Sequence, residues 1–458
     1  MRIELPAVLR KKGKLADLLG VKCCDTEAVV PLGIATHSDE VRAGDLFVAL
    51  QGSKANGAAF ALGAVKRGAV AVLCDSPIES CPMLICSDPA EALLNAAAIH
   101  RRENGGFLVA ISGSAGKTTV KEAVASMLEL QGSVAYSKGN FNSMLGFPLS
   151  MLSFSPADFW VVELGINHPD EMEPMARAAA PDLAVLTNVG SAHIGNFRDR
   201  KQLLEEKTKI AVELRKTGKL LVPASIASEV SFNRQMQIVT FGEGGAYCLE
   251  RIAMKKDGVA GDLKTPDGVI TNLVWPLAGK SGVAILETVG AVGHLMGLSQ
   301  AVVREGLRRA ALSTPRMRAI LVGERCLIDD GYNASPEAMI EAVSILVHHG
   351  EGRSTVAVLG DMLELGAYSE ALHRRVGAVV AAQGLSLLIT YGDHACEIAD
   401  GAIGAGMPAK RVFQFAATRR DDLIETICRL APKDAMILFK ASAKMEFSKL
   451  AREVASKL

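Results

Sequence analysis

The sequence predicts an α/β fold of three domains, with a parallel sheet in the central domain and a Rossmann-like, doubly wound sheet in the C-terminal domain. Its 458 residues allow about three domains at roughly 150 residues each. From residue 107 onward, near-continuous apolar runs alternate with helix-length amphipathic segments. This alternation is typical of parallel strands that are covered by helices on both faces.

The first domain is predicted over residues 1–105. Short apolar runs at residues 46–50 and 69–74 indicate strands, and an alanine-rich stretch at residues 59–67 indicates a helix. Residues 101–106 are polar and end in two glycines, so we expect a joint between domains there.

The central domain is predicted over residues 106–312. Buried strands are expected at residues 107–112, 159–164 and 183–187. Residues 238–275 read as short strands separated by glycine turns, which predicts an antiparallel appendage before a helix at residues 283–296.

The C-terminal domain is predicted over residues 313–458, after a linker at residues 311–318 that contains a Thr-Pro pair and two arginines. Strands are expected at residues 326–329, 355–359, 385–391 and 435–440, with helices that begin at Pro336, Tyr368 and Glu397. This order predicts a second doubly wound sheet.

Composition excludes several classes of protein. Fifty basic side chains balance fifty acidic ones, which disfavours a cationic nucleic-acid binder, and only 5% of residues are aromatic. Nine cysteines without a CxxC pair indicate a reduced compartment. The first twenty residues lack the apolar region of a secretory signal, and no apolar run approaches a membrane span. We therefore expect a cytoplasmic protein with no nucleic-acid or membrane partner.

The most specific motif in the sequence is a predicted phosphate-binding loop. Residues 112–119 read Ser-Gly-Ser-Ala-Gly-Lys-Thr-Thr, directly after a predicted buried strand and before a predicted helix. Glycines let backbone N–H groups approach phosphate oxygens, Lys117 supplies positive charge, and the Thr118 hydroxyl can bind magnesium. The spacing is shorter than the full Walker A pattern, yet its context favours nucleotide binding over a plain strand-ending turn.

Two further residues follow predicted strands of the same sheet. Glu163 ends one strand and His193 follows the next, so both are expected at the carboxyl edge that faces a ligand. Glu163 is interpreted as a metal ligand, with a solvated strand end as the alternative. His193 is either a ligand or an ordinary hydrogen-bonded histidine.

The spacing of three further residues does not decide their roles. Lys207 lies in the charged stretch 205–209, where the residues alone favour a solvated helix face. Asn140 and Asn142 are either hydrogen-bonding loop residues or turn formers.

Taken together, these segments resemble the Mur ligases of peptidoglycan synthesis along the whole chain. The resemblance runs through residues 113–119, 139–148, 163–168, 192–193, 329–336 and 360–373. The strings Glu-Leu-Gly-Ile-Asn-His at 163–168 and Gly-Asp-Met-Leu-Glu-Leu-Gly at 360–366 are similar to those of the branch that adds D-alanyl-D-alanine. They differ from the branch that adds diaminopimelate or lysine.

The resemblance implies a fold and an activity. It implies a UDP-sugar domain, a central P-loop ATPase-type domain, and a C-terminal domain that closes over ATP and the amino substrate. The implied reaction is ATP-dependent ligation of UDP-N-acetylmuramoyl-tripeptide to D-alanyl-D-alanine through an acyl phosphate, with two Mg²⁺ ions, in a cytoplasmic monomer. Such a transfer depends on positioning and charge neutralisation.

The resemblance also assigns residues to roles. Catalytic roles fall on Lys117, Glu163, His193 and Lys207. Magnesium ligands are Thr118, Glu163, His193 and Lys207, the last as a carbamylated lysine. The implied nucleotide-binding residues are Gly113, Ser114, Ala115, Gly116, Lys117, Thr118, Thr119, Arg316, Asp330, Tyr332 and Asn333. The implied substrate-binding residues are Thr36, Ser38, Asn140 and Asn142.

The sequence departs from the family pattern at several recognition positions. Asp39 stands where the family has arginine beside a diphosphate, which predicts repulsion there. Ser281 and Ile285 replace polar family residues near adenine, and Ala443 replaces an arginine. Two alternatives therefore stand beside the leading hypothesis: a paralogous Mur-type ligase with another acceptor, and a nucleotide-binding protein that has lost ligation.

Overall fold

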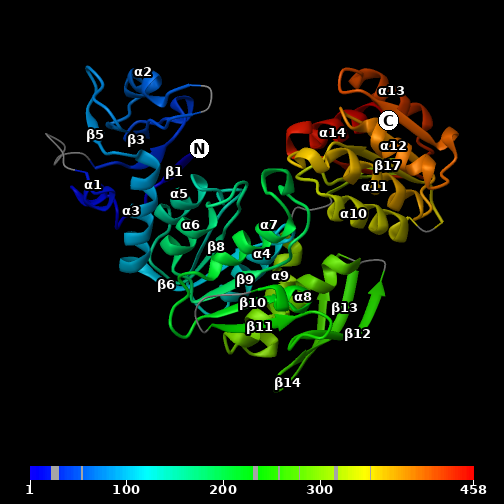
Figure 1. Cartoon of the computed structure of the whole chain (residues 1–458), viewed down its shortest axis with the longest axis horizontal. Helices are drawn as coiled ribbons and strands as arrows, with labels where there is room; N and C mark the ends of the chain where they lie inside the picture. The colour runs from blue at the N-terminus through cyan, green and yellow to red at the C-terminus, as the bar shows by residue number, and fades with distance from the viewer. Residues whose placement is uncertain are drawn as a thin grey trace.

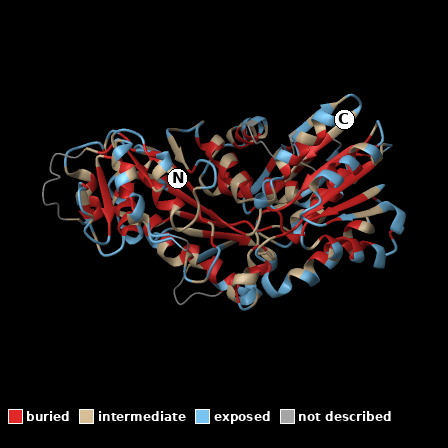
Figure 2. Cartoon of the chain, turned by 90° about the horizontal axis from the view of Figure 1, so that it is seen from above, coloured by how far each residue is buried: buried red, intermediate tan, exposed pale blue. Residues whose placement is uncertain are grey.

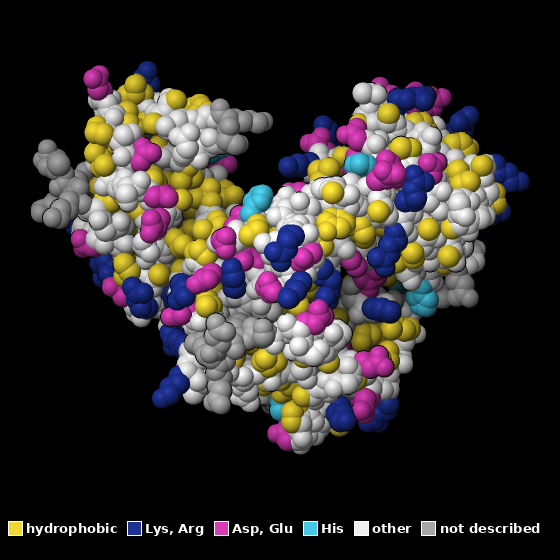
Figure 3. All heavy atoms as spheres, in the orientation of Figure 1, with side chains coloured by type: hydrophobic (Ala, Val, Ile, Leu, Met, Phe, Trp, Pro, Cys, Tyr) yellow, Lys and Arg dark blue, Asp and Glu magenta, His cyan; other side chains and the backbone are white. Residues whose placement is uncertain are grey.

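The chain folds into sheets that are covered by helices (Figure 1). The structure is a computed structural model, and it describes residues 1–21, 30–52, 55–230, 236–255, 258–277, 279–313, 318–350 and 352–458. The N-terminal and C-terminal parts stand on either side of the central part, and the space-filling view is hollowed between them (Figure 3).

The N-terminal sheet has the order β1-β2-β3-β4-β5. Its strands are β1 (Arg2–Glu4), β2 (Gly33–Ala35), β3 (Asp45–Val48), β4 (Ala71–Cys74) and β5 (Met83–Ile85). Only β1 is antiparallel to its neighbour. Helices α1 (Lys14–Leu19), α2 (Ala61–Lys66) and α3 (Pro89–Asn104) accompany it. The strands and the helix predicted in this region are confirmed.

At residues 101–106, where a joint is expected, the chain passes from the first sheet's helix to the next sheet without a loop. Helix α3 continues to Asn104, and the first strand of the next sheet begins at Gly105. Arg101 is fully buried there; its guanidinium donates to the carbonyl oxygens of Ala179 and Gly106 and pairs with Asp182 at 2.9 Å. Because these acceptors satisfy its charge inside the protein, Arg101 makes a buried contact there, although residues 102–106 are exposed or half-buried.

The central sheet is parallel throughout, in the order β11-β10-β9-β6-β8-β7. Its strands are β6 (Gly105–Ser112), β7 (Val134–Tyr136), β8 (Ala157–Glu163), β9 (Leu183–Leu186), β10 (Lys219–Pro223) and β11 (Gln237–Phe241). Its helices are α4 (Lys117–Leu128), α5 (Gly146–Leu152), α6 (Met172–Ala179), α7 (Arg200–Thr208), α8 (Gly279–Leu295) and α9 (Gln300–Ser313).

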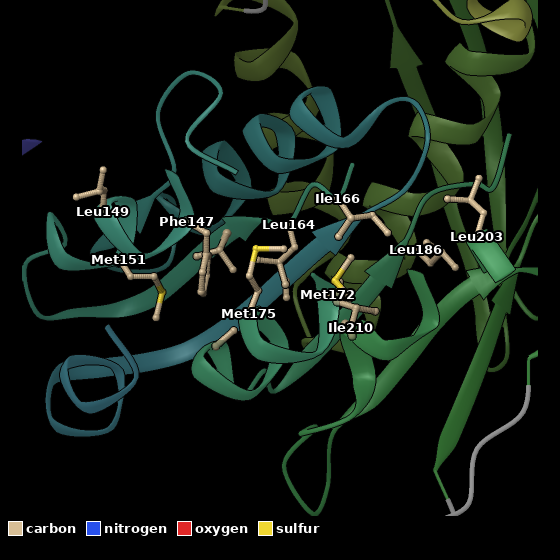
Figure 4. Packing of buried hydrophobic residues seen from close by; sticks show 14 of the residues in the cluster. Phe147, Leu149, Met151, Leu164, Ile166, Met172, Met175, Leu186, Leu203 and Ile210 are labelled. Carbon is tan, nitrogen blue, oxygen red and sulfur yellow. The ribbon is translucent and has the colours of Figure 1, made fainter. Parts of the chain in front are cut away.

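Both faces of this sheet are buried, which explains the continuous apolar strands. On β6, Leu108 and Ala110 pack into the cluster shared with α3, α5 and α6, whereas Val109 and Ile111 pack against α4, α8 and α9. Figure 4 shows the first of these clusters, with Met172 and Met175 among its labelled side chains, and Figure 2 shows buried residues concentrated in the strands. Alternate strand residues therefore face opposite helical layers, as a doubly covered parallel sheet requires.

The antiparallel appendage predicted at residues 238–275 is confirmed for its larger part. Strands β12 (Cys248–Lys255), β13 (Gly258–Thr265) and β14 (Gly268–Trp275) form an antiparallel sheet. Residues 237–241 differ from the prediction, because β11 pairs in parallel with β10 at the edge of the central sheet. A short alternating strand does not reveal its own partner, so its periodicity could not distinguish the two sheets.

The C-terminal sheet has the order β15-β16-β20-β17-β18-β19, and only β15 is antiparallel to its neighbour. Its strands are β15 (Arg318–Val322), β16 (Arg325–Asp329), β17 (Thr355–Gly360), β18 (Leu387–Tyr391), β19 (Val412–Phe415) and β20 (Met436–Lys440). Its helices are α10 (Pro336–His349), α11 (Ser369–Ala381), α12 (Ala395–Gly404), α13 (Arg420–Leu430) and α14 (Phe447–Lys457).

The second doubly wound sheet is thus confirmed, with β15 and β19 as strands that the sequence did not reveal. Half of the linker expected at residues 311–318, residues 314–317, lies outside the described residues: α9 ends at Ser313 and β15 begins at Arg318. Within the described residues, no helix is both long enough and apolar enough to span a bilayer.

Candidate active site

The phosphate loop joins β6 to α4 at the carboxyl edge of the central sheet. Gly113 has a φ of +147°, and a Cβ atom there would lie 2.0 Å from the Thr187 hydroxyl, so the position requires glycine. Residues after β9 hold the loop: Thr187 donates to the Ala115 carbonyl at 2.6 Å, and the Asn188 side-chain oxygen accepts from the backbone N–H groups of Ser114 and Ala115. These contacts tie the loop to the segment after β9, at the N-terminus of α4.

Two hydrogen bonds fix the Glu163 carboxylate beside the loop. Its Oε2 accepts from the Thr118 hydroxyl at 2.9 Å, and its Oε1 accepts from the Asn142 amide at 2.7 Å. Glu163 is only 2% exposed. The solvated strand end considered for Glu163 and the plain turn former considered for Asn142 are therefore wrong, because packing of β8 against β6 buries this edge.

Thr118 and Glu163 fit one magnesium ion. Mg²⁺ prefers oxygen ligands at about 2.0–2.1 Å in octahedral geometry, so adjacent ligands on one ion lie about 2.9 Å apart. The Thr118 and Glu163 oxygens lie at that separation. The hydroxyl and the carboxylate are thus already spaced as neighbouring ligands.

Lys117, the lysine of the loop, begins α4. Its ammonium donates to the Gly113 carbonyl at 2.8 Å, which holds the charge over the loop. Positive charge at a helix N-terminus and oriented N–H groups together favour a bound anion.

Lys207 lies under the same loop, from the last turn of α7. Asp199 caps that helix by accepting from the N–H of Gln202 at 2.8 Å. The Lys207 side chain is 1% exposed, with its Nζ 3.4 Å from the Gly113 carbonyl, so the solvated helix face expected from the residues alone is wrong. Burial, with a smaller repulsion from Lys117, lowers the pKa of Lys207 to about 7. An uncharged amine is therefore well populated near neutral pH.

His193 faces this group of residues from the loop after β9. Burial lowers the pKa of His193, the Glu364 carboxylate opposes that shift, and the charges of Lys117 and Lys207 add to it. Its Nδ1 makes a very short contact with the Glu364 carboxylate of the C-terminal part. The structure thus brings His193 near both lysines and gives it a carboxylate partner.

Among the described residues, no group of three or more His, Cys, Asp or Glu side chains forms a metal site. A second ion beside His193 would need a further anionic ligand. A carbamate on Lys207 would supply one, since carbamylation replaces the cation with two oxygen ligands.

The remaining predicted residues lie elsewhere. Asp330 follows β16 and pairs with the buried Lys440 at 2.5 Å, the exposed Asn333 accepts from Lys440 through its carbonyl, and Tyr332 is 51% exposed. Thr36 and Ser38 lie at the end of β2 and in the following turn. Asn140 is exposed, Thr119 is buried in α4, and Arg316 lies outside the described residues.

Three of the departures from the family pattern are accommodated by contacts in the structure. The charge of Asp39 is offset because the Arg67 guanidinium pairs with it at 2.9 Å. Ile285 is 5% exposed and packs in the core between α8 and the sheet. Ser281 donates to Glu341 of α10, so this segment contacts the C-terminal part.

Sequence reasoning did not assign roles to Asn188 or Glu364. Asn188 has a local signal, since it directly follows a buried strand at the edge where the phosphate loop lies. Glu364 appeared in the sequence analysis only within a segment similar to the family. Its role could not be predicted because its partner, His193, is 171 residues away.

The fold and the site define a three-domain α/β protein with a phosphate loop and a magnesium-compatible carboxylate. Residues 32–103 match the Mur ligase family, catalytic domain; residues 111–285 match the Mur ligase middle domain; and residues 316–443 match the Mur ligase, glutamate ligase domain. This chain belongs to the Mur ligase family and is a ligase.

Named relatives are similar along most of their length. The UDP-N-acetylmuramoyl-tripeptide–D-alanyl-D-alanine ligase of Bacillus subtilis is 30% identical over 439 residues, which cover 93% of this chain and 94% of the relative. The Escherichia coli enzyme of the same name is 31% identical, over 80% of this chain and 83% of its own. The crystal structure of MurF from Acinetobacter baumannii has a TM-score of 0.86 at 27% identity, covering 97% and 98% of the two chains.

Proposed function

We propose that this chain is an ATP-dependent amide ligase that joins D-alanyl-D-alanine to UDP-N-acetylmuramoyl-tripeptide in peptidoglycan precursor synthesis. Full-length similarity to ligases with that name supports the substrates. A MurF ligase from Thermotoga maritima, 25% identical with a TM-score of 0.77 over 93% of this chain, was solved with ADP, which supports the nucleotide. The observation that carries the proposal is the fixed phosphate loop beside the buried, hydrogen-bonded Glu163.

Each third of the chain has a proposed task. Residues 1–105 would bind the UDP-sugar, with Thr36 and Ser38 near the nucleotide and Asn140 and Asn142 of the central part nearer the peptide. Residues 106–312 would bind ATP. Residues 313–458 would close over it, with Arg316, Asp330, Tyr332 and Asn333 toward the nucleotide.

The reaction requires two transfers. An oxygen of the tripeptide carboxylate bonds to the γ-phosphorus of ATP while the bond to the ADP oxygen breaks, which gives an acyl phosphate. The amine of D-alanyl-D-alanine then bonds to the acyl carbon, inorganic phosphate leaves, and the amine releases a proton. Neither step needs a protein nucleophile, so positioned positive charge is the main requirement.

The residues of this chain supply that positioning. The loop N–H groups and Lys117 would orient the β- and γ-phosphates, and the hydroxyl of Thr118 with the carboxylate of Glu163 would hold one Mg²⁺. His193 and a carbamylated Lys207 would hold a second. These ions would neutralise the charge that develops on the transferred phosphoryl group.

A cytoplasmic location and a monomeric state complete the proposal. ATP, the proposed co-substrate, is available in the cytoplasm. The monomeric state is carried over from the family resemblance.

The test is phosphate release from ATP and Mg²⁺ with UDP-N-acetylmuramoyl-tripeptide, with and without D-alanyl-D-alanine, and identification of the product by mass. Both the diaminopimelate and the lysine forms of the tripeptide should be supplied. Release that depends on the dipeptide, with the pentapeptide as product, supports the proposal.

Two other outcomes correspond to the alternatives. A preference for another amino acid or dipeptide would identify a paralogous ligase with a different acceptor. ATP binding without turnover on any acceptor, beside an active control ligase, would identify a protein that has lost ligation.

A further inference from the structure

We propose that Glu364 of the C-terminal part is a positioning residue for His193, so that the metal site of the central part is complete only when the C-terminal part is docked. This inference rests on the proposed function, because it assigns His193 to a metal ion. It concerns a residue pair that joins two parts of the chain, through His193 Nδ1 and a carboxylate oxygen of Glu364.

Both residues of the pair have an unusual backbone. His193 has a φ of +64° and Glu364 a φ of +66°, in the left-handed region that side chains other than glycine rarely adopt. Such conformations each cost free energy and persist where the surrounding structure holds them. Here each one presents its side chain to the other across the junction.

A second contact fixes the two segments in register. The N–H of Gly195 donates to the backbone carbonyl of Glu364 at 3.1 Å. The backbones meet so closely that a Cβ atom on Gly195 would lie 2.2 Å from the nitrogen of Gly366. The Glu364 carboxylate therefore does not reach His193 from a loose loop; backbone packing sets its distance.

The loop that carries Glu364 is anchored from inside the C-terminal part. The N–H of Met362 donates to Nε2 of the buried His373 at 2.9 Å, and the N–H of Leu363 donates to the Ser442 hydroxyl at 2.9 Å. The residues just before Glu364 are thus hydrogen-bonded to the C-terminal part.

The contact sets the chemistry of the imidazole. Because a carboxylate accepts, Nδ1 of His193 carries the proton, and Nε2 keeps its lone pair for a ligand. A carboxylate behind a metal-binding histidine fixes its ring and tautomer, and removing such a partner typically weakens metal affinity about 10–100-fold. Docking of the C-terminal part and metal binding are thereby coupled through one residue.

The experiment is a Mn²⁺ titration of the full chain, followed by electron paramagnetic resonance, with a non-hydrolysable ATP analogue bound. In Glu364→Gln the backbone bond to Gly195 remains and only the carboxylate is lost. We expect Mn²⁺ affinity at one of the two sites to fall about 10–100-fold, with Glu364→Asp intermediate. Glu364→Gln combined with His193→Ala should add little to His193→Ala alone.

Glu370→Gln is the matched control. Glu370 lies in the same C-terminal part, and its ion pair with Arg374 stays within α11. Unchanged Mn²⁺ affinity in Glu364→Gln would overturn the inference. So would an equal loss in Glu370→Gln, since that would indicate an effect unrelated to the contact with His193. Wild-type protein that binds Mn²⁺ but ligates no acceptor would instead count against the proposed function.

Discussion

Glu163 is the residue on which the first magnesium site depends, because both of its carboxylate oxygens are already oriented. We expect Glu163→Gln to reduce kcat by roughly 100–1,000-fold, as does loss of other preorganised electrostatic groups, and to leave the melting temperature nearly unchanged. Lys117→Ala should behave similarly. Steady-state phosphate release measures the effect, and Glu173→Gln, on the exposed side of α6, is the control. Near-normal rates in either site variant would show that the assignment is wrong.

A Lys207→Ala variant tests whether the buried amine of Lys207 acts through a carbamate. Lys207→Ala should be inactive, and added bicarbonate should not restore it, since no amine remains to be carbamylated. Short-chain carboxylates should partly restore phosphate release by filling the space with metal-binding oxygens. Rescue by bicarbonate, or full activity without any addition, would contradict the role proposed for Lys207.

At the scale of elements, the turn from β6 to α4 tolerates only glycine at position 113. Gly113→Ala would place a methyl group 2.0 Å from the Thr187 hydroxyl in a backbone conformation with positive φ. Strain of about 1–3 kcal/mol is expected, with a lower melting temperature and weak ADP binding by calorimetry. Gly268→Ala, at the open start of β14, should change neither measurement. ADP affinity equal to wild type in Gly113→Ala would mean that the loop can rearrange.

Helix α10 is the element that joins the C-terminal part to the central part at two further points. Glu337 and Glu341, one turn apart, accept from Ser191 and Ser281. We expect Glu337→Ala with Glu341→Ala to lose roughly 1 kcal/mol for each contact and to split thermal unfolding into separate transitions in calorimetry. Glu370→Ala, whose ion pair stays within α11, is the control. A single unshifted transition would show that these contacts do not couple the two parts.

The whole molecule should lose stability in acid, in part through His100 between α3 and the central sheet. Its Nε2 donates to the Phe154 carbonyl at 2.9 Å. Burial lowers the pKa of His100, as does Lys14 to a lesser degree, whereas Glu103 and the Phe154 carbonyl raise it. Below the ordinary value of 6.5, the unfolded chain therefore binds more protons than the folded chain, and stability falls as pH falls.

His100→Gln removes this titration while it retains a donor for the Phe154 carbonyl. We expect the free energy of unfolding of wild type to drop more than that of the variant between pH 7.5 and 5.5, by up to about 1.4 kcal/mol per pH unit. Urea denaturation at the two pH values gives the comparison. Parallel losses in both proteins would assign the acid sensitivity to other groups.

Local patterns were sufficient for most of the strands and helices and for the phosphate loop, but not for β15, β19 or the partner of β11. Continuous apolar strands follow from burial on both faces of β6, and the glycine spacing of residues 113–116 follows from the shape that a phosphate cradle needs. Glu163 could be placed at the ligand edge because parallel strands end on the same side. These properties depend on neighbours within a few residues, so the sequence alone determined them.

Only the tertiary structure decided which polar residues are buried and which distant ones meet. Lys207 lies in a charged stretch, yet packing of α7 under the loop buries it; Arg101 lies in a polar stretch, yet carbonyl groups and Asp182 enclose it. Glu364 meets His193 across 171 residues. Such contacts depend on which helix face packs inward and on how whole sheets dock, and neither is encoded in the spacing of adjacent residues.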